Sequence, residues 1–158
     1  MEKFERIPLG NTDAQVSRVC LGAMLMGTVM DKEESFRTLD RFVERGGNFI
    51  DTANCYAWWV GTGEYVGDES ENVLGEWMSA RNNRDKIFLA TKCSARLRDP
   101  HSIRGPDGVP RWSEVPANYE GASRGAIISA VNDSLRRLRT DYIDLYYVHV
   151  DDRSTSLE

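Results

Sequence analysis

Three short apolar runs, each ending on a charged or polar side chain, constrain the fold of this 158-residue chain more than any other feature. They occupy residues 48–51, 87–92 and 143–149. The runs are apolar almost throughout instead of alternating with polar residues, which is typical of parallel strands covered on both faces. Because parallel strands need crossover connections, usually helices, the sequence predicts an α/β fold.

Helix signals occur in the segments between these runs. Asp31 is placed to cap a helix, Glu34 follows three positions later as in a capping box, and Gly46 ends the pattern. Apolar side chains recur with helical spacing in two later segments. The predicted elements are a hairpin over 4–7 and 15–17, a strand over 18–22, a helix over 31–45, a strand over 48–51, a helix over 70–80, a strand over 87–92, a helix over 123–139 and a strand over 143–149.

The carboxyl ends of the predicted strands carry the residues that we expect to do chemistry. Parallel α/β folds build their sites on this rim, from strand ends and the loops that follow them. Asp51, Lys92 and His149 end three of the strands. Tyr56 follows Asp51 by five residues in polar loop sequence.

A lysine that closes an apolar strand is unfavourable unless an anion lies beside it, because taking an ammonium out of water costs several kcal/mol. Asp51 is the expected partner of Lys92, although an aspartate at a strand end is about as often a cap. A tyrosine beside that ammonium is expected to have its pKa lowered from about 10 towards neutrality. Tyr56 is therefore predicted to be a general acid.

A single histidine on an apolar strand is most often a satisfied core side chain. His149, however, follows the apolar run and precedes Asp151 and Asp152, which favours a place on the rim. A neutral imidazole and the phenol of Tyr56 converging on one oxygen would stabilise negative charge that develops on a carbonyl. Such charge develops when hydride reaches the carbonyl carbon, and protein side chains do not supply hydride. A nicotinamide cofactor is therefore implied.

Two other patterns carry less weight. Gly61 and Gly63, with Gly67, suggest a phosphate-binding glycine pattern, but they do not join a strand directly to a helix. His149 and Asp151 could seed a metal site, but the chain has two histidines, and His101 lies in a loop rich in proline and glycine. These are too few nitrogen ligands for a typical zinc hydrolase, so no metal is predicted.

Two long connections, over 57–69 and 93–121, follow strands and precede helices, so they are predicted to lie on the same rim. The first contains Trp58 and Trp59, and the second contains Trp112. Tryptophans in such loops either pack into the core or form the wall of a substrate pocket. The sequence leaves both interpretations open for Trp58 and Trp59.

Composition narrows the classes of function. A hydrophobic content of 41% and a charged content of 28% are typical of a globular protein. The formal charge of −5 argues against nucleic acid or an anionic membrane as a partner, because both need a basic face. Cys20, Cys55 and Cys93 are odd in number and lack metal-type spacing, which favours a reducing compartment. With no apolar run of membrane-spanning length, a cytoplasmic protein is predicted.

Residues 47–56, 90–92 and 134–149 together resemble the aldo-keto reductases, and the resemblance covers nearly the whole chain. It implies a (β/α)8 TIM barrel and an NADP(H)-dependent enzyme that reduces small-molecule aldehydes or ketones to alcohols. The implied catalytic residues are Asp51, Tyr56, Lys92 and His149. The implied cofactor-binding residues are Gly22, Ala23, Met24 and Asp51, and the implied substrate-binding residues are Trp59 and His149.

A barrel of this type typically needs about 250 residues. The 158 residues are therefore expected to form a single incomplete domain over 1–158: the N-terminal half of the barrel, with about four β/α units and the hairpin. Four strands cannot close a barrel, so the outer strands are expected to pair with a C-terminal half or a second copy. The alternative to a reductase is a noncatalytic half-barrel or a regulatory subunit that senses pyridine nucleotides.

Overall fold

The computed structural model describes residues 3–156, and two residues at each end of the predicted 1–158 domain lie outside them. Its main sheet has four parallel strands in the order β3-β4-β5-β6, and a separate hairpin pairs β1 with β2. The strands are β1 (Arg6–Pro8), β2 (Gln15–Ser17), β3 (Cys20–Gly22), β4 (Phe49–Asp51), β5 (Phe88–Cys93) and β6 (Leu145–Val148). The α-helices are α1 (Lys32–Glu44), α2 (Glu69–Arg81) and α3 (Arg124–Leu138), and the 3₁₀ turns are η1 (Arg84–Lys86) and η2 (Val115–Asn118).

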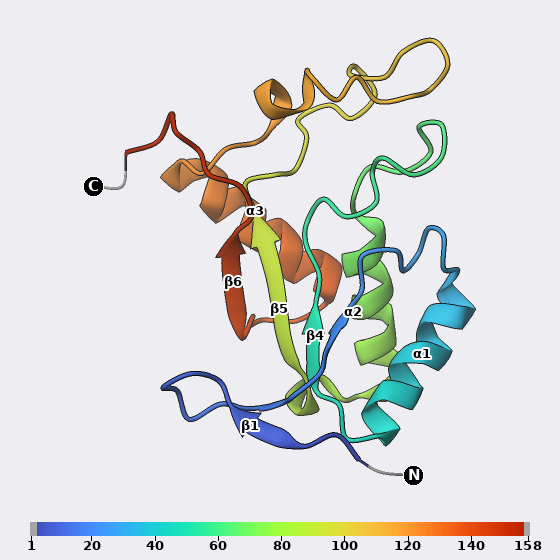
Figure 1. Ribbon diagram of the computed structural model, residues 1–158, viewed down its shortest axis with the longest axis vertical. Helices are drawn as coiled ribbons and strands as arrows, with labels where there is room; N and C mark the ends of the chain where they lie inside the picture. Colours follow the sequence, from blue (N-terminus) through green and yellow to red (C-terminus); the bar gives the residue numbers. More distant parts are fainter. Residues whose placement is uncertain (1–2, 157–158) are drawn as a thin grey trace.

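The helices lie together on one side of the sheet, with α3 behind β5 and β6 in Figure 1. The predicted α/β order is confirmed, and the arrangement is part of a barrel. The expectation that both sheet faces are covered is wrong for β6 in the described residues, where Tyr147 and Val148 are 41% and 54% exposed. These two residues point to opposite faces, so neither face of this outer strand is fully covered. No helix among residues 3–156 is long and apolar enough to cross a membrane.

Strand register brings the rim residues together. Asp51 pairs with Gly22 of β3 on one side and with Ala90 of β5 on the other. Paired residues share a sheet face, and side chains alternate between faces, so Lys92, two residues beyond Ala90, points to the same face as Asp51. The sheet itself therefore places the carboxylate and the ammonium next to each other.

Helix α1 forms where its local signals predict it. The Asp31 carboxylate accepts a hydrogen bond from the backbone N–H of Glu34 at 2.8 Å, which satisfies one donor of the first turn. Leu39 and Phe42 bury the inner stripe of the helix. The chain then turns through Gly46, whose φ of +84° is strained for any residue with a Cβ.

Helices α2 and α3 cross at close range because Gly75 has no side chain. A Cβ there would lie 2.2 Å from the carbonyl oxygen of Arg137. Beside this crossing, the fully buried Glu71 accepts hydrogen bonds from Arg137 Nε at 2.7 Å and from Thr91 Oγ1 at 2.6 Å. A buried carboxylate needs such partners, so this network locks both helices to β5.

The apolar side chains form two clusters. The first fills the space between the sheet and the helices, and the second lies at the carboxyl ends of the strands. Loops 57–69 and 93–121 both contribute to the second cluster, as Trp58 and Ile103 show. The guanidinium of Arg104 also joins these loops, because it donates to the carbonyl oxygens of Trp58 and of Gly61, the latter at 3.2 Å. The prediction that both loops lie on one rim is confirmed.

Candidate active site

An ion pair occupies the centre of the rim. Lys92 Nζ lies 2.7 and 2.6 Å from the two carboxylate oxygens of Asp51, 2.7 Å from the carbonyl oxygen of Thr52 and 2.6 Å from the hydroxyl oxygen of Tyr56. The three protons of the ammonium are thus directed at Asp51, Thr52 and Tyr56. The side chains of Lys92 and Asp51 are 13% and 26% exposed, so water screens this pair only partly. The expected partner of Lys92 is present.

Tyr56 accepts a hydrogen bond from Lys92 and donates one to Asp51 Oδ2 at 3.3 Å. Burial raises the pKa of Tyr56, and the charge of Asp51 and its hydrogen bond to the phenol raise it further. The expected lowering of this pKa is therefore wrong for the arrangement observed, since burial and the carboxylate beside the phenol both raise it. The phenol keeps its proton at neutral pH and can donate it.

His149 completes the group. Its ring stands at 84° to the Tyr56 ring, with the ring centres 5.6 Å apart. Its backbone N–H donates to the carbonyl oxygen of Cys93 at 2.9 Å, and Nδ1 lies 3.6 Å from the sulfur of Cys55. Burial lowers the pKa of His149, and the charge of Lys92 lowers it further, so the imidazole is neutral. The structure thus brings all four predicted catalytic residues together.

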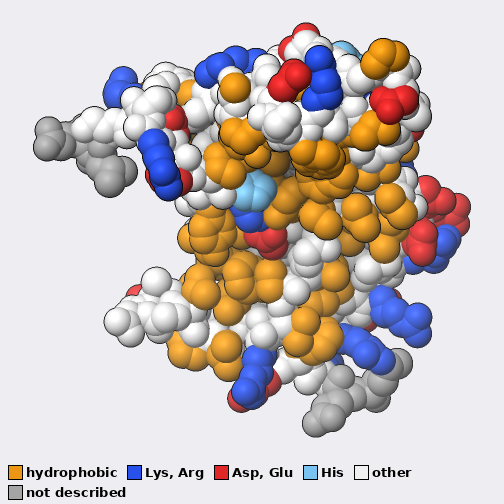
Figure 2. All heavy atoms as spheres, turned by 45° about the horizontal axis from the view of Figure 1, so that its top comes forward, with side chains coloured by type: hydrophobic (Ala, Val, Ile, Leu, Met, Phe, Trp, Pro, Cys, Tyr) orange, Lys and Arg blue, Asp and Glu red, His pale blue; other side chains and the backbone are white. Residues whose placement is uncertain are grey.

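The group lies on the uncovered face of the sheet. Figure 2 turns the rim towards the viewer and shows a histidine, a basic and an acidic side chain set among hydrophobic side chains. Such a setting lowers the local dielectric constant and strengthens each polar contact within it.

The predicted cofactor residues lie along β3 and just beyond it. Gly22 pairs with Asp51, and a Cβ added to it would meet nothing within 4 Å, so the space beside the carboxylate is open. Met24 is 41% exposed. Ala23 has its side chain fully buried in the core, while its backbone N–H donates to the carbonyl oxygen of Asp51 at 2.8 Å. Gly22 and Met24 are therefore accessible, and the side chain of Ala23 is not.

The tryptophans of the rim loops have different environments. Trp58 is 3% exposed, so the core interpretation is right for it. Trp59 is half-buried, stands perpendicular to Trp58 at 6.0 Å and packs against the same cluster as Tyr56. Trp112 also packs against Trp58, with the ring centres 5.6 Å apart, and is 58% exposed.

Sequence reasoning missed two residues that hold the segment between Asp51 and Tyr56. Glu120 Oε1 accepts from the side chain of Asn54 at 2.8 Å and from the backbone N–H of Ser94 at 2.7 Å. Arg96 donates to the carbonyl oxygen of Asn54 at 2.8 Å. These partners are 26 to 66 residues apart in the chain, so no local motif marks them.

The glycine pattern and the possible metal ligands of the sequence analysis can now be placed in the structure. Gly61 and Gly63 lie within the rim loop with positive φ, and Gly67 packs against the backbone of Cys55, where a Cβ would come within 2.9 Å of Cα. In the described part of the chain, no three His, Cys, Asp or Glu side chains gather as a metal site. The three cysteines are free.

The fold and the site place the molecule among the α/β-barrel proteins, with its polar group on the rim where such barrels carry their sites. The model of the Aldo/keto reductase family matches residues 18–158, so the chain belongs to this family.

Relatives and solved structures agree with this assignment. The chain is 43% identical over 152 residues to a norsolorinic acid reductase from Emericella nidulans, covering 91% of this chain and 34% of the relative. It is 42% identical over 153 residues to an aryl-alcohol dehydrogenase [NADP(+)] from Phanerodontia chrysosporium, covering 90% and 35%. The chain thus spans about a third of the length of the curated relatives it matches.

Two structures of aldo-keto reductases match the fold. The holo form from Bacillus halodurans superposes with a TM-score of 0.62 at 31% identity, covering 90% of this chain and 39% of the other. A Klebsiella pneumoniae protein in complex with NADPH superposes with a TM-score of 0.59 at 27% identity, covering 86% and 36%.

Proposed function

We propose that the whole protein, as its gene encodes it, reduces the carbonyl group of an aldehyde or ketone to an alcohol with NADPH, and that Tyr56 is the general acid. The observation that carries this proposal is the phenol of Tyr56, which is protonated, hydrogen-bonded to Lys92 and flanked by the neutral His149 on an apolar face. The names of the relatives, a reductase and an NADP-dependent alcohol dehydrogenase, support it.

The described residues fit one end of a nicotinamide cofactor. Gly22 leaves open space beside Asp51, which a planar ring could occupy, and the exposed Met24 offers an apolar contact. Gly22, Met24 and the carboxylate of Asp51 would therefore hold the ring, with the backbone of Ala23 as part of the same edge. When bound, the reduced nicotinamide supplies the hydride.

The side chains of the chain then supply the proton and the electrostatic stabilisation. His149 donates a hydrogen bond to the carbonyl oxygen and fixes its position. Tyr56 gives its hydroxyl proton to that oxygen as negative charge develops on it. Lys92 stabilises the phenolate that remains, and Asp51 holds the ammonium in place through its two carboxylate oxygens. A proton from solvent then restores the phenol.

Trp59 is proposed to form a wall of the substrate site, because it packs against the same apolar cluster as Tyr56 and stays half-buried. Trp59→Ala is expected to change the relative kcat/KM of small and large carbonyl substrates by about tenfold, as loss of apolar contact does, and to leave the Kd for NADPH nearly unchanged. If the substitution lowers the melting temperature and leaves specificity unchanged, Trp59 is a packing residue.

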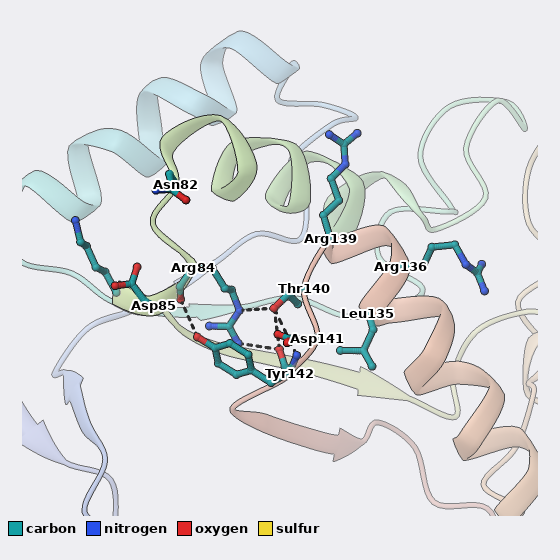
Figure 3. A pocket seen from close by; sticks show the side chains of 10 residues that line it. Asn82, Arg84, Asp85, Leu135, Arg136, Arg139, Thr140, Asp141 and Tyr142 are labelled. Atoms are coloured by element: carbon teal, nitrogen blue, oxygen red, sulfur yellow. Dashed lines mark hydrogen bonds between the residues drawn. The ribbon is translucent and has the colours of Figure 1, made fainter.

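The proposed acid is tested by Tyr56→Phe in the whole protein. The ring and its packing stay, and only the proton donor is lost, so kcat is expected to fall by about 10² to 10⁴ while NADPH still binds. Stopped-flow reduction of an aromatic aldehyde and fluorescence titration of NADPH measure the two effects. Tyr142→Phe is the matched control: Tyr142 precedes β6 and so lies at the opposite end of the sheet (Figure 3), and its substitution is expected to leave kcat unchanged.

Two outcomes would contradict the proposal. Retention of more than about a tenth of the wild-type kcat by Tyr56→Phe would exclude Tyr56 as the acid. A wild-type protein that binds NADPH and reduces no aldehyde or ketone would support the noncatalytic, nucleotide-sensing alternative.

A further inference from the structure

A buried thiol contacts the imidazole of the site. Cys55 immediately precedes Tyr56, is 4% exposed, and places its sulfur 3.6 Å from Nδ1 of His149. In the described part of the chain, Nδ1 is the nitrogen of this ring that has a hydrogen-bond partner. Because Nδ1 is engaged by the thiol, Nε2 is the ring nitrogen that remains to donate to a carbonyl oxygen in the proposed function.

Cys55 and His149 are anchored independently of each other. Gly67 lies against the backbone of Cys55, and Arg96 holds the preceding carbonyl group, that of Asn54, at 2.8 Å. The backbone of His149 is fixed to Cys93 of β5 by a hydrogen bond of 2.9 Å. The fold therefore fixes both backbones, and the burial of Cys55 keeps its sulfur close to Nδ1 of His149.

The protonation of the two groups decides the direction of the hydrogen bond. Burial raises the pKa of the Cys55 thiol to about 12, so the sulfur keeps its proton at neutral pH. The imidazole is neutral, because burial and the charge of Lys92 lower the pKa of His149. A neutral thiol is a poor acceptor, whereas the unprotonated nitrogen of an imidazole is a good one. The favourable arrangement is thus S–H donating to Nδ1.

We propose that Cys55 is a positioning residue whose thiol donates to Nδ1 of His149 and so holds the imidazole in the tautomer that carries its proton on Nε2. Nε2–H is then directed away from the thiol and is the donor available to a substrate oxygen. The catalytic meaning of this inference rests on the proposed function, but the tautomer itself does not. The two can therefore fail separately.

Nitrogen NMR of the ring tests the tautomer without substrate or cofactor. In the wild-type protein, labelled with ¹⁵N-histidine, Nδ1 of His149 is expected to resonate as an unprotonated nitrogen and Nε2 as a protonated one, with the signals assigned by their loss in His149→Gln. Cys55→Ala removes the donor, so a mixture of tautomers and a higher pKa of His149 are expected, since the hydrogen bond favours the neutral ring. Cys55→Ser keeps a donor and is expected to restore the wild-type tautomer.

Cys93→Ala is the matched control for the spectra. Cys93 is also a buried cysteine, but its thiol donates to the carbonyl oxygen of Tyr147 at 3.5 Å and does not touch the ring. Its loss removes the same atoms from the core and is expected to leave the His149 signals as they are in the wild type. If Cys93→Ala changes those signals as much as Cys55→Ala does, the change reflects a general loss of core packing, and the inference is overturned.

The rate provides the second readout. Loss of one such hydrogen bond is expected to lower kcat of Cys55→Ala about fivefold to tenfold with KM for NADPH unchanged, and Cys55→Ser is expected to recover part of this loss. Identical ¹⁵N signals in the wild type and Cys55→Ala would overturn the inference even if the enzyme is active. A further outcome is that the signals change as expected in Cys55→Ala while the wild-type protein reduces no carbonyl. In that case the positioning role stands and the proposed function fails.

Discussion

The two ends of the parallel sheet each carry a cation, a carboxylate and a tyrosine, yet they are built for different tasks. At the carboxyl ends of the strands the tyrosine hydroxyl accepts a hydrogen bond from the cation. At the opposite end the cation lies over the face of the tyrosine ring, 3.8 Å from its centre. The first set is Lys92, Asp51 and Tyr56, and the second is Arg84, Asp144 and Tyr142.

The polar groups of the second set form hydrogen bonds that hold the fold together. Arg84 donates to Asp144 at 2.7 Å, to the carbonyl oxygens of Ile87 and Tyr142 at 2.8 and 2.9 Å, and to Thr140 Oγ1 at 3.1 Å, and Figure 3 shows it turned towards Thr140 and Tyr142. The hydroxyl of Tyr142 donates to the carbonyl oxygen of Arg84 at 3.4 Å. This cluster joins the turns that precede β5 and β6.

The comparison shows that neither the types of residue present nor the size of a nearby cavity identifies a catalytic site. A cavity of about 930 Å³ adjoins Arg84, far from the strand ends that carry Asp51 and Lys92. What separates the two sets is the tyrosine hydroxyl: at the rim it lies between an ammonium and a carboxylate beside an open surface, so it can pass its proton to a ligand. Arginine is always charged and forms rigid, directed bonds, which suits a joint; lysine is a compact charge, which suits a proton relay.

The largest effect is expected from Lys92→Met in the whole protein. The substitution removes the ammonium that is proposed to stabilise the phenolate, so kcat is expected to fall by at least about 10². The acid is active while Tyr56 is protonated, and activity is lost as the pH rises through its pKa. Without the positive charge that pKa rises, so the alkaline limb of the pH–kcat profile is expected to move to higher pH. An unmoved limb with substantial activity would remove Lys92 from this role.

The second effect concerns the opposite end. Arg84→Met leaves the carboxylate of Asp144 without its cation, in a site where the arginine side chain is 14% exposed. Breaking such a pair is expected to lower the free energy of unfolding by about 2 to 4 kcal/mol, measured by urea denaturation, with kcat unchanged. Arg153→Met is the control, because the 92% exposed Arg153 pairs with Asp151 in solvent and its loss is expected to cost less than about 0.5 kcal/mol. Equal costs for both would show that the second set is no structural joint.

Local signals predict the elements well, and most errors arise where distant residues meet. The cap of α1 at Asp31 and the stripe of Leu39 and Phe42 depend on neighbours in the chain, and both are present. The strand predicted from residue 48 begins instead at Phe49, and the strand predicted from 18 begins at Cys20. The side chain of Asn48 accepts a hydrogen bond from the backbone N–H of Ser17 at 2.6 Å. This bond joins the hairpin to the main sheet.

The site follows the same rule. The strand-end pattern suffices to bring Asp51 and Lys92 together, because parallel register dictates it. The pKa of Tyr56 could not be predicted, because it depends on burial and on the direction of the hydrogen bond to Asp51. The contact between Cys55 and His149 joins residues 94 positions apart, so no spacing in the sequence indicates it.

The smallest effect is expected from Tyr142→Phe. It makes in the second set, that of Arg84, Asp144 and Tyr142, the same change that Tyr56→Phe makes at the rim. Tyr142 is 43% exposed, its hydroxyl forms one long hydrogen bond, and the ring face that packs on Arg84 is kept. The free energy of unfolding is expected to change by less than about 0.5 kcal/mol. Urea denaturation with a fixed m-value measures it. A loss of more than about 1.5 kcal/mol would mean that the hydroxyl, and not the ring over the guanidinium, holds this end together, and the contrast between the two tyrosines would then lie in their surroundings alone.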